Sequence, residues 1–600
     1  MSKTLNDFSW KVAGEAGHGI LNAGLSMFAK TCLRSGLDVF ATAEYPSLIR
    51  GGHNNLDVRV SDKEIHSHNR HIDMLVALND ESVRKHAHKL SKGGAIIYDG
   101  EKMPIVKESI RSDVKLYSVP LFTVANEAGG QIMRNTVAIG ATMALLNFDM
   151  ATFEKVIGDN FKKKGDDVIN ANIKAARAGY DYVKKNYKDG FSHELKGSEK
   201  GKGKMFLSGH EALVAGAIKA GCKFYSAYPM TPASSVLGGM SANEQKFNLV
   251  VKQTEDEIAA INMAIGASYA GARAMVGTSG GGFSLMVEGF GLAAMTETPL
   301  VVVESQRPGP ATGMATHSGQ ADLRFMLHAS TDEFPRVVIA PGDVEQCFYE
   351  TIKAFNLADK YQMPVVIMTD KFLGESYWSA NEFDTSSVKI ERGKMLSDKE
   401  TEALSEYSRY KVTPDGVSPR SVPGQKNAPF VASSYEHDEH GFEREEENVR
   451  VAMHNKRYRK FTQASKELKN PPPIGDKNAD ATIIAWGSTK GPILEAMKLL
   501  KAKKISANYQ QVLYLSPFPS EDMIKIIKGA KKAIVIENNK TSQLNSLIRE
   551  HCLLSVDNKV LKYDGRPFSP QDISECVEEI IKSMSPKTIE MATFGRIDKE

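Results

Sequence analysis

Two short stretches in the middle of the chain place polar side chains on rigid turns beside predicted strands. Thr231 lies within YPMTP (Tyr228–Pro232), where two prolines fix the backbone around its hydroxyl group. Arg307 directly follows a strongly apolar run, and Thr312 and Thr316 come soon after it. A planar guanidinium with hydroxyl groups nearby is a suitable receptor for a carboxylate. Taken singly, the first stretch is better explained as a plain turn and the arginine as a salt-bridge partner.

Between these stretches lies an acidic run that begins a helix of small residues. Glu255, Asp256 and Glu257 precede AAINMAIGASYAGARA, and the glycine turn TSGGG (Thr278–Gly282) follows. Acidic residues at a helix N-terminus are stabilised by the helix dipole, so capping alone explains any one of them. A small-residue helix also permits close packing against a neighbour, which the glycine turn favours.

Two glycine-rich stretches near the N-terminus could form ligand-binding loops. GEAGHGI (Gly14–Ile20) follows the predicted strand Trp10–Ala13, and glycines there allow backbone N–H groups to approach an anion. In AEYPSLIRGGHNN (Ala43–Asn55), Arg50 is followed by two glycines, as in a loop that reaches a ligand. A tight turn and a solvated loop remain the alternatives. His18 is expected to be a local polar residue rather than a metal ligand.

Apolar β-rich runs alternate with helical stretches along most of the chain, which predicts an α/β fold with largely parallel sheets. The candidate strands are Ile72–Leu78, Ala95–Tyr98, Leu300–Glu304, Val365–Thr369, Thr482–Trp486 and Ala533–Glu537.

Composition breaks divide the 600 residues into several domains, since one hydrophobic core does not extend over such a length. We predict domains at 1–192, 205–380 and 478–600. A Gly/Lys-rich linker at 193–204 joins the first two. The polar segment 381–477 is either a surface excursion or part of a subunit interface.

Bulk composition excludes several classes of protein. The chain is 42% hydrophobic and 25% charged with a net charge of +3, which gives no reason to expect a nucleic-acid partner. No apolar run is long enough to span a membrane, and the N-terminus lacks a signal-peptide core. The five scattered cysteines indicate a reducing cytoplasm and form neither an iron–sulfur nor a zinc motif.

The motifs together resemble the 2-oxoacid:ferredoxin oxidoreductase family. YPMTPAS, EDEIAAINMAIGASYAGARA, TSGGGFSLM and RPGPATGMAT stand in the family's order and spacing, whereas family members usually have Asn in place of His210. GEAGHGI and IRGGHNN resemble the family's gamma subunit, here fused ahead of an alpha subunit. The resemblance implies a gamma-type α/β domain, a pyrimidine-type thiamine-diphosphate-binding domain and a transketolase C-terminal-like domain that contains YDGRPFS (Tyr563–Ser569).

The resemblance also implies residue roles at a thiamine diphosphate site. Glu257 matches the carboxylate that acts on the cofactor's aminopyrimidine ring, with Glu255 as the alternative. Tyr228, Pro229 and Thr231 match cofactor-binding positions, and Thr231 also lies near the substrate oxygen.

Substrate binding is implied at three further positions. Arg307 and Thr316 match residues that bind the carboxylate of the 2-oxo acid, and Arg307 is also counted among the catalytic residues with Glu257 and Thr231. Arg50 matches a cationic position in a gamma-domain loop near the active site.

What the chain lacks implies a partner. The diphosphate–Mg²⁺ motif and cluster cysteines are absent, and the resemblance implies that both belong to a separate beta subunit, in a heterodimer or a dimer of heterodimers. The implied reaction is the CoA-dependent oxidative decarboxylation of a 2-oxo acid with ferredoxin as electron acceptor, reversible in principle. GVSPRSVPG (Gly416–Gly424) and EHDEHG look like the form found in 2-oxoglutarate-type and broad archaeal-type enzymes, so 2-oxoglutarate is favoured, with pyruvate and other oxo acids as alternatives.

Two other functions compete. A transketolase or lipoamide-linked oxo-acid dehydrogenase also divides thiamine diphosphate between two α/β domains, but the gamma-like N-terminus and RPGPATGMAT disfavour it. A non-catalytic scaffold subunit is disfavoured because Thr231, Glu257, Arg307 and Thr316 are all retained.

Overall fold

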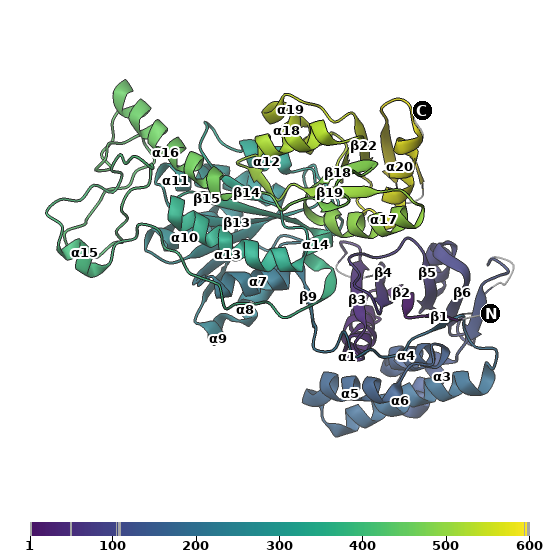
Figure 1. The fold of residues 1–600 in the computed structure, drawn as a ribbon. Coiled ribbons are helices and arrows are strands. Elements are labelled where there is room, and N and C mark those ends of the chain that lie inside the picture. Colours follow the sequence, from purple (N-terminus) through teal and green to yellow (C-terminus); the bar gives the residue numbers. More distant parts are fainter. Residues whose placement is uncertain (1–2, 49–50, 104, 106–109, 593–594, 597–600) are drawn as a thin grey trace. The chain divides into compact units, whose positions relative to one another are not determined.

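The structure is a computed structural model that describes residues 3–48, 51–103, 105, 110–592 and 595–596. It divides into two compact units, shown along the chain in Figure 1. Met1–Leu207, Ser376–Glu382 and Ser569–Asp572 form the first unit, and the other residues form the second. Each unit is described by itself.

The first unit is built on a mixed sheet whose central strand, β2, is buried along nearly its whole length. Strand β2 pairs parallel with β5 and antiparallel with β4, so this sheet is less uniformly parallel than the sequence suggested. In sheet order the strands are β7 (Lys115–Ser118), β6 (Leu90–Tyr98), β5 (Ile72–Ala77), β2 (Asp7–Glu15), β4 (His53–Ser61), β3 (Asp38–Glu44), β16 (Tyr377–Ala380) and β9 (Met205–Ser208).

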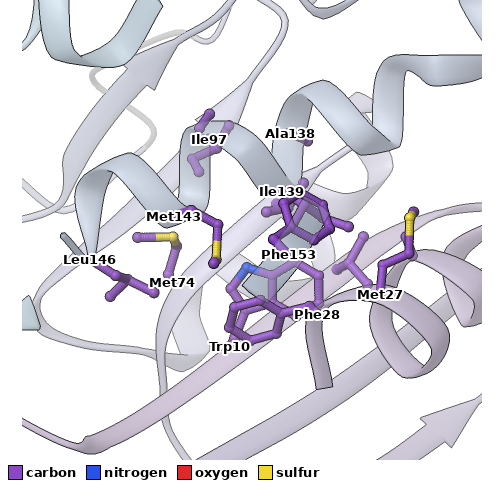
Figure 2. Packing of buried hydrophobic residues seen from close by; sticks show 14 of the residues in the cluster. Trp10, Met27, Phe28, Met74, Ile97, Ala138, Ile139, Met143, Leu146 and Phe153 are labelled. Carbon is purple, nitrogen blue, oxygen red and sulfur yellow. The ribbon is translucent and has the colours of Figure 1, made fainter. Parts of the chain in front are cut away.

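Helices pack on this sheet over a core that Figure 2 shows from close by. The rings of Trp10 and Phe28 lie 4.5 Å apart between their centroids, and Phe153 lies beside them. Gly140 and Gly179 let two of the helices touch backbone to backbone, where any Cβ would clash. The helices are α1 (Lys30–Arg34), α2 (Asp80–His86), α3 (Leu121–Ala128), α4 (Arg134–Leu145), α5 (Met150–Phe161) and α6 (Asp166–Asn186), with the helical turn η1 (Asn22–Ala29) before α1.

The segment predicted as a linker, 193–204, lies along this first unit. Its strand β8 (His193–Glu194) pairs parallel with β1 (Thr4–Leu5). The Ser198 N–H donates to the Ser35 carbonyl at 2.8 Å.

The second unit begins with a sheet that is parallel except at one edge. Its strands, in sheet order, are β11 (Val250–Gln253), β10 (Phe224–Ala227), β12 (Ala274–Thr278), β13 (Leu300–Gln306), β15 (Pro364–Asp370), β14 (Val337–Ile339) and the antiparallel β20 (Tyr514–Ser516). Because parallel strands end at the same edge, YPMTP after β10, TSGGG after β12 and RPGP after β13 all emerge there. The sheet register therefore gathers the three central motifs.

Helices cover this sheet, and a second sheet completes the unit (Figure 1). The helices are α7 (Gly209–Lys219), α8 (Ser234–Ala242), α9 (Glu244–Phe247), α10 (Glu257–Tyr269), α11 (Gly280–Met295), α12 (Leu323–His328), α13 (Val344–Tyr361) and α14 (Lys371–Glu375). The second sheet runs β17 (Ile474–Gly475), β19 (Ala507–Gln511), β18 (Ala481–Ala485), β21 (Ala533–Glu537), β22 (Asn558–Lys562), β23 (Thr588–Ala592) and β24 (Gly595–Arg596). Its helices are α17 (Lys490–Ala502), α18 (Ser520–Gly529), α19 (Gln543–Cys552) and α20 (Pro570–Lys582).

The predicted alternation of strands and helices is confirmed, and so is the α/β class. All six candidate strands form, most of them with bounds shifted by one or two residues. None of the helices in the described part of the chain combines the length and the apolarity that a membrane span requires.

The polar segment 381–477 contains α15 (Asp398–Glu402) and α16 (Glu447–Glu467) and is held on the second unit by buried charges. The carboxylate of Asp359 in α13 forms ion pairs with three arginines: Arg273 at 2.8 Å, Arg392 at 2.9 Å and Arg420 at 3.2 Å. Arg392 and Arg420 come from the segment, so one buried carboxylate ties it to the sheet domain.

A second buried cluster holds α16. Glu297, at the end of α11, lies 2.5 Å from the Lys456 Nζ and 2.7 Å from the Lys460 Nζ, and all three side chains are buried. Burial pushes the pKa of Glu297 upward, but the two lysines outweigh it and hold that pKa well below its usual value. Burial lowers the pKa of Lys460 to about 7. The segment is therefore an integral part of the fold.

We predict that Glu297→Gln destabilises the protein strongly, because two buried lysines would lose their counter-charge. Removing one partner of a buried ion pair costs roughly 3–5 kcal/mol. Glu402→Gln is the matched control, because Glu402 pairs with Lys426 at 3.4 Å on the surface and such a pair contributes about 0–1 kcal/mol. Denaturant midpoints measure both, and equal shifts would contradict the role given to Glu297.

Candidate active site

Thr231 and Arg307 meet at the edge where the three motifs emerge. Thr231 is half-buried, and its backbone carbonyl accepts a 2.7 Å hydrogen bond from Arg307 Nη1. Tyr228 and Pro229, just before it, are exposed. The turn after β10 and the turn after β13 are thus joined directly. Two of the expected site residues, Thr231 and Arg307, therefore lie side by side.

The guanidinium of Arg307 lies near a negative charge, and one of its N–H donors has no acceptor among the described residues. Burial lowers the pKa of Arg307, and the negative charge of Asp322 opposes that shift. Its Nε is buried and has no hydrogen-bond acceptor among the described residues. A cation with unused donor capacity is suited to receive an anionic ligand.

The loop that carries Thr316 is clamped by the C-terminal sheet domain of the same unit. Ser318 donates its N–H to the Gly565 carbonyl at 3.1 Å, within YDGRPFS. Gln320 donates to the Trp486 carbonyl at 3.0 Å and accepts from the Asn538 N–H at 3.1 Å. The Thr316 side chain is buried, with its hydroxyl 3.3 Å from His317 Nδ1, and no hydrogen bond among the described residues joins it to Arg307.

Glu257 begins helix α10 but does not cap it. The capping bond comes from Asp256, whose Oδ1 accepts from the Ala259 N–H at 2.8 Å. The side chain of Glu257 is buried, and its Oε1 has no hydrogen-bond partner among the described residues, whereas Glu255 is exposed. Buried polar atoms are normally paired, so a bound molecule that donates a hydrogen bond fits this oxygen.

The glycines that follow β12 form the first turn of helix α11 and make room for this carboxylate. A Cβ built on Gly282 would lie 2.5 Å from Glu257 Oε1 and would also overlap the Thr278 hydroxyl. Only glycine leaves Glu257 where it is. The small residues noted in the sequence therefore serve the placement of one carboxylate.

Comparisons with known proteins identify the chain's relatives. Residues 215–456 match the family model "Pyruvate flavodoxin/ferredoxin oxidoreductase, thiamine diP-bdg". Residues 9–182 match "Pyruvate ferredoxin/flavodoxin oxidoreductase", and residues 479–573 match "Pyruvate:ferredoxin oxidoreductase core domain II". The alpha subunit of 2-oxoacid:ferredoxin oxidoreductase 2 from Aeropyrum pernix is 32% identical over 97% of this chain and 99% of its own length. The chain belongs to the 2-oxoacid:ferredoxin oxidoreductase family.

A solved structure of this family resembles the whole chain. The 2-oxoglutarate:ferredoxin oxidoreductase from Magnetococcus marinus, with 2-oxoglutarate, coenzyme A and succinyl-CoA bound, is 33% identical with a TM-score of 0.90, covering 96% of this chain and 100% of that one. The 2-oxoglutarate oxidoreductase subunit KorA of Mycobacterium tuberculosis is 27% identical over 94% of this chain and 90% of its own length. The predicted family and the alpha-subunit class are confirmed, and the relatives' subunit names place the chain in a multi-subunit oxidoreductase.

His210, the one visible departure from the family's motif, is a core residue in this member. Its Nδ1 lies 2.6 Å from the Ser235 hydroxyl and its Nε2 lies 3.0 Å from the Thr369 hydroxyl. Burial lowers its pKa to about 4, so the imidazole is neutral at neutral pH. These contacts account for His210 without a catalytic role.

Some expectations lie beyond the described residues, and some polar groups escaped the sequence analysis. Arg50 is outside the described residues, while His18 makes a local contact with the Glu15 N–H at 3.3 Å. Glu304 is fully buried in β13, and the charge of Asp322 acts on Arg307, but neither acid stands in a recognisable motif. The available signal was a single acid in the otherwise apolar strand PLVVVES.

We predict that Gly282→Ala lowers kcat of the assembled enzyme about 10²-fold, because the added methyl displaces Glu257 from its position. Gly281→Ala is the control, since a Cβ there would lie 3.6 Å from its nearest neighbour, the Ala311 carbonyl. Oxo-acid-dependent viologen reduction measures both, with circular dichroism to verify the fold. Equal activities would show that Gly282 does not position Glu257.

Proposed function

We propose that this alpha subunit, with a separate beta subunit, catalyses the CoA-dependent oxidative decarboxylation of a 2-oxo acid, with 2-oxoglutarate favoured. The oxo acid and CoA would give acyl-CoA and carbon dioxide, and two electrons would pass to ferredoxin. One observation carries the proposal. Arg307 is hydrogen-bonded to the Thr231 carbonyl at the sheet edge where the first turn of α11 borders Glu257, whose Oε1 has no partner among the described residues.

Glu257 is the residue that would engage thiamine diphosphate. When bound, the cofactor supplies the thiazolium ring that stabilises negative charge on the substrate's carbonyl carbon. The buried Glu257 Oε1 would accept a hydrogen bond from the aminopyrimidine ring. This contact would favour the imino tautomer of that ring. Tyr228 and Pro229 would flank the same ring from the turn after β10.

Arg307 would orient the oxo acid by its carboxylate. Its bond to the Thr231 carbonyl fixes one edge of the guanidinium and leaves other donors for the ligand. The Thr231 hydroxyl, on the same turn, would lie beside the substrate oxygen, and Thr316 would contribute a second hydroxyl.

A beta subunit would complete the site. The five cysteines are buried free thiols, and the described residues contain no group of three metal-binding side chains, which supports placing Mg²⁺ and the iron–sulfur cluster on the partner. Apolar side chains are exposed on the helices next to Glu257: Ile258, Met263 and Leu285 are 51%, 44% and 51% exposed. We assign this face to the beta subunit, because the rest of the cofactor must be held across it.

The preference for 2-oxoglutarate rests on the relatives rather than on a visible specificity pocket. Arg420, the cation within GVSPRSVPG, is buried against Asp359 and is therefore not available as a ligand for a second carboxylate. A side-chain receptor for 2-oxoglutarate would have to come from other residues or from the partner.

We predict that Arg307→Ala raises KM for the oxo acid and lowers kcat/KM about ten- to a hundredfold, because one charge-assisted contact contributes roughly 1.5–3 kcal/mol. Arg324→Ala is the control, since Arg324 is exposed and lies 3.7 Å from Glu550. Viologen reduction by the complex with 2-oxoglutarate, pyruvate and 2-oxobutyrate, with and without CoA, gives both the effect and the substrate. Kinetics of Arg307→Ala within twofold of wild type would remove Arg307 from the site.

We predict that the isolated chain contains neither iron nor acid-labile sulfide, because its cysteines have no cluster spacing. Metal and sulfide analysis of the pure chain and of the reconstituted complex tests this. Stoichiometric iron in the folded chain alone would contradict the assignment of the cluster to the partner.

A further inference from the structure

The loop between β13 and α12 folds back on itself, so that its two ends meet. Gln306, the last residue of β13, accepts a hydrogen bond at its side-chain Oε1 from the Asp322 N–H, at 3.2 Å. Within the loop, a Cβ built on Gly319 would lie 3.3 Å from Pro308 Cγ, so Gly319 packs against Pro308. Pro308 directly follows Arg307. The position of Arg307 therefore depends on how the second half of the loop is held.

Gln320, the residue after Gly319, is fully buried and is bound by the C-terminal sheet domain through both its backbone and its side chain. Its N–H donates to the Asn538 carbonyl at 2.9 Å, and its Oε1 accepts from the Asn538 N–H at 3.1 Å. Its Nε2 donates to the Trp486 carbonyl at 3.0 Å. Its carbonyl accepts from Asn539 Nδ2, also at 3.0 Å. One side chain of the loop thus makes a complete set of polar contacts with another domain.

The partners of Gln320 stand at a particular place in the C-terminal sheet. Trp486 directly follows β18 and Asn538 directly follows β21, and these two strands are adjacent and parallel. From β18 the chain passes to β19 on one side, whereas β21 leads to β22 on the other side. In open parallel sheets, the crevice at such a reversal of strand order is where ligands bind. Here a side chain of the same protein fills that crevice.

Two features shape the crevice to fit Gln320. Gly487 has a φ of +58°, and a Cβ on it would lie 2.8 Å from Gln320 Nε2, so glycine leaves room for the amide. The buried Glu537 carboxylate accepts from Asn539 Nδ2 at 2.8 Å and from the Leu544 N–H at 2.9 Å. These bonds fix the Asn539 amide that donates to Gln320.

We propose that Gln320 is a positioning residue: it occupies the ligand crevice of the C-terminal sheet domain and thereby holds the loop so that Arg307 stays against the Thr231 carbonyl, ready for the oxo acid's carboxylate. The effect on the oxo acid rests on the proposed function, whereas the attachment of the loop does not. Gln320 acts through Arg307, by way of the contact between Gly319 and Pro308.

The attachment is tested first, by amide hydrogen–deuterium exchange in the full chain without its partner. Gln320→Ala should speed exchange about tenfold or more in peptides from 308–322, because the loop then opens more often. Gln511→Ala is the matched control. Gln511 is also buried in the C-terminal sheet, and its amide makes two hydrogen bonds with the Gln346 amide, at 2.9 and 2.7 Å. Loop exchange at the wild-type rate in Gln320→Ala would overturn the attachment.

The positioning role is tested in the assembled complex by a double-mutant cycle with Arg307. Gln320→Ala should raise KM for the oxo acid about tenfold and keep KM for CoA within about twofold. In the Arg307→Ala background, the same substitution should change KM for the oxo acid by less than about twofold, because a residue that acts through the guanidinium has no effect without it. Gln511→Ala should leave both Michaelis constants near their wild-type values.

Gln543→Ala is a milder variant that carries the test if Gln320→Ala does not fold. Gln543 Nε2 donates to the Ala321 carbonyl at 2.7 Å, and its Oε1 accepts from the Arg324 N–H at 3.0 Å. Its loss should raise KM for the oxo acid about threefold, again with no added effect in the Arg307→Ala background.

The outcomes separate the positioning role from the proposed function. If Gln320→Ala and Arg307→Ala have additive effects, or if KM for CoA rises as much as KM for the oxo acid, Gln320 supports the fold and does not position Arg307. If the wild-type complex turns over no 2-oxo acid, the proposed function fails, whereas the exchange measurement still decides whether Gln320 holds the loop.

Discussion

A single hydrogen bond, from Arg307 Nη1 to the Thr231 carbonyl, joins the turns that follow β10 and β13 across the intervening strand β12. The bond can form only because the strands are parallel and end at one edge. Helix α11 begins directly after β12, the strand between them, and Glu257 lies against Gly282 in its first turn. The register of one sheet thus fixes a cation, a hydroxyl and a carboxylate relative to one another.

This arrangement is kept rigid by buried charge at its periphery. Asp359 and Glu297 bind cations from the polar segment 381–477 and attach that segment to the sheet domain. Hydrogen bonds from Gln320 and Ser318 attach the loop after Arg307 to the C-terminal sheet domain. Desolvated ion pairs of this kind contribute little net stability but are costly to break, so they oppose local displacement. A site that must fit a second subunit benefits from such fixed geometry.

Local sequence patterns predicted the strands well, because a buried strand needs apolar side chains on one or both of its faces. Strand Ala533–Glu537 forms with the predicted bounds, and PLVVVES forms a buried strand. The motifs YPMTP and RPGPATGMAT also pointed to the region around Thr231 and Arg307. The proline-flanked turn and the arginine after a buried strand are local features, and parallel pairing brings them together.

Features that depend on distant residues could not be predicted. The segment 381–477 looked like a polar excursion because the partners of Arg392, Arg420 and Lys460 lie far away in the chain. The sequence also left the assignment within the EDE run open; burial separates Glu257 from the exposed Glu255 and leaves capping to Asp256. The buried acid Glu304 was not singled out because it lies within an apolar run.

The most direct test of the central claim is hydrogen–deuterium exchange at C2 of thiamine diphosphate in the assembled complex. Glu257→Gln preserves size but removes the charge, so we expect exchange to slow by roughly 10²–10⁴-fold. Glu255→Gln, at an exposed position, should leave the rate close to that of wild type. If Glu257→Gln exchanges at the wild-type rate, Glu257 is not the carboxylate that acts on the cofactor, and the account of this site is wrong.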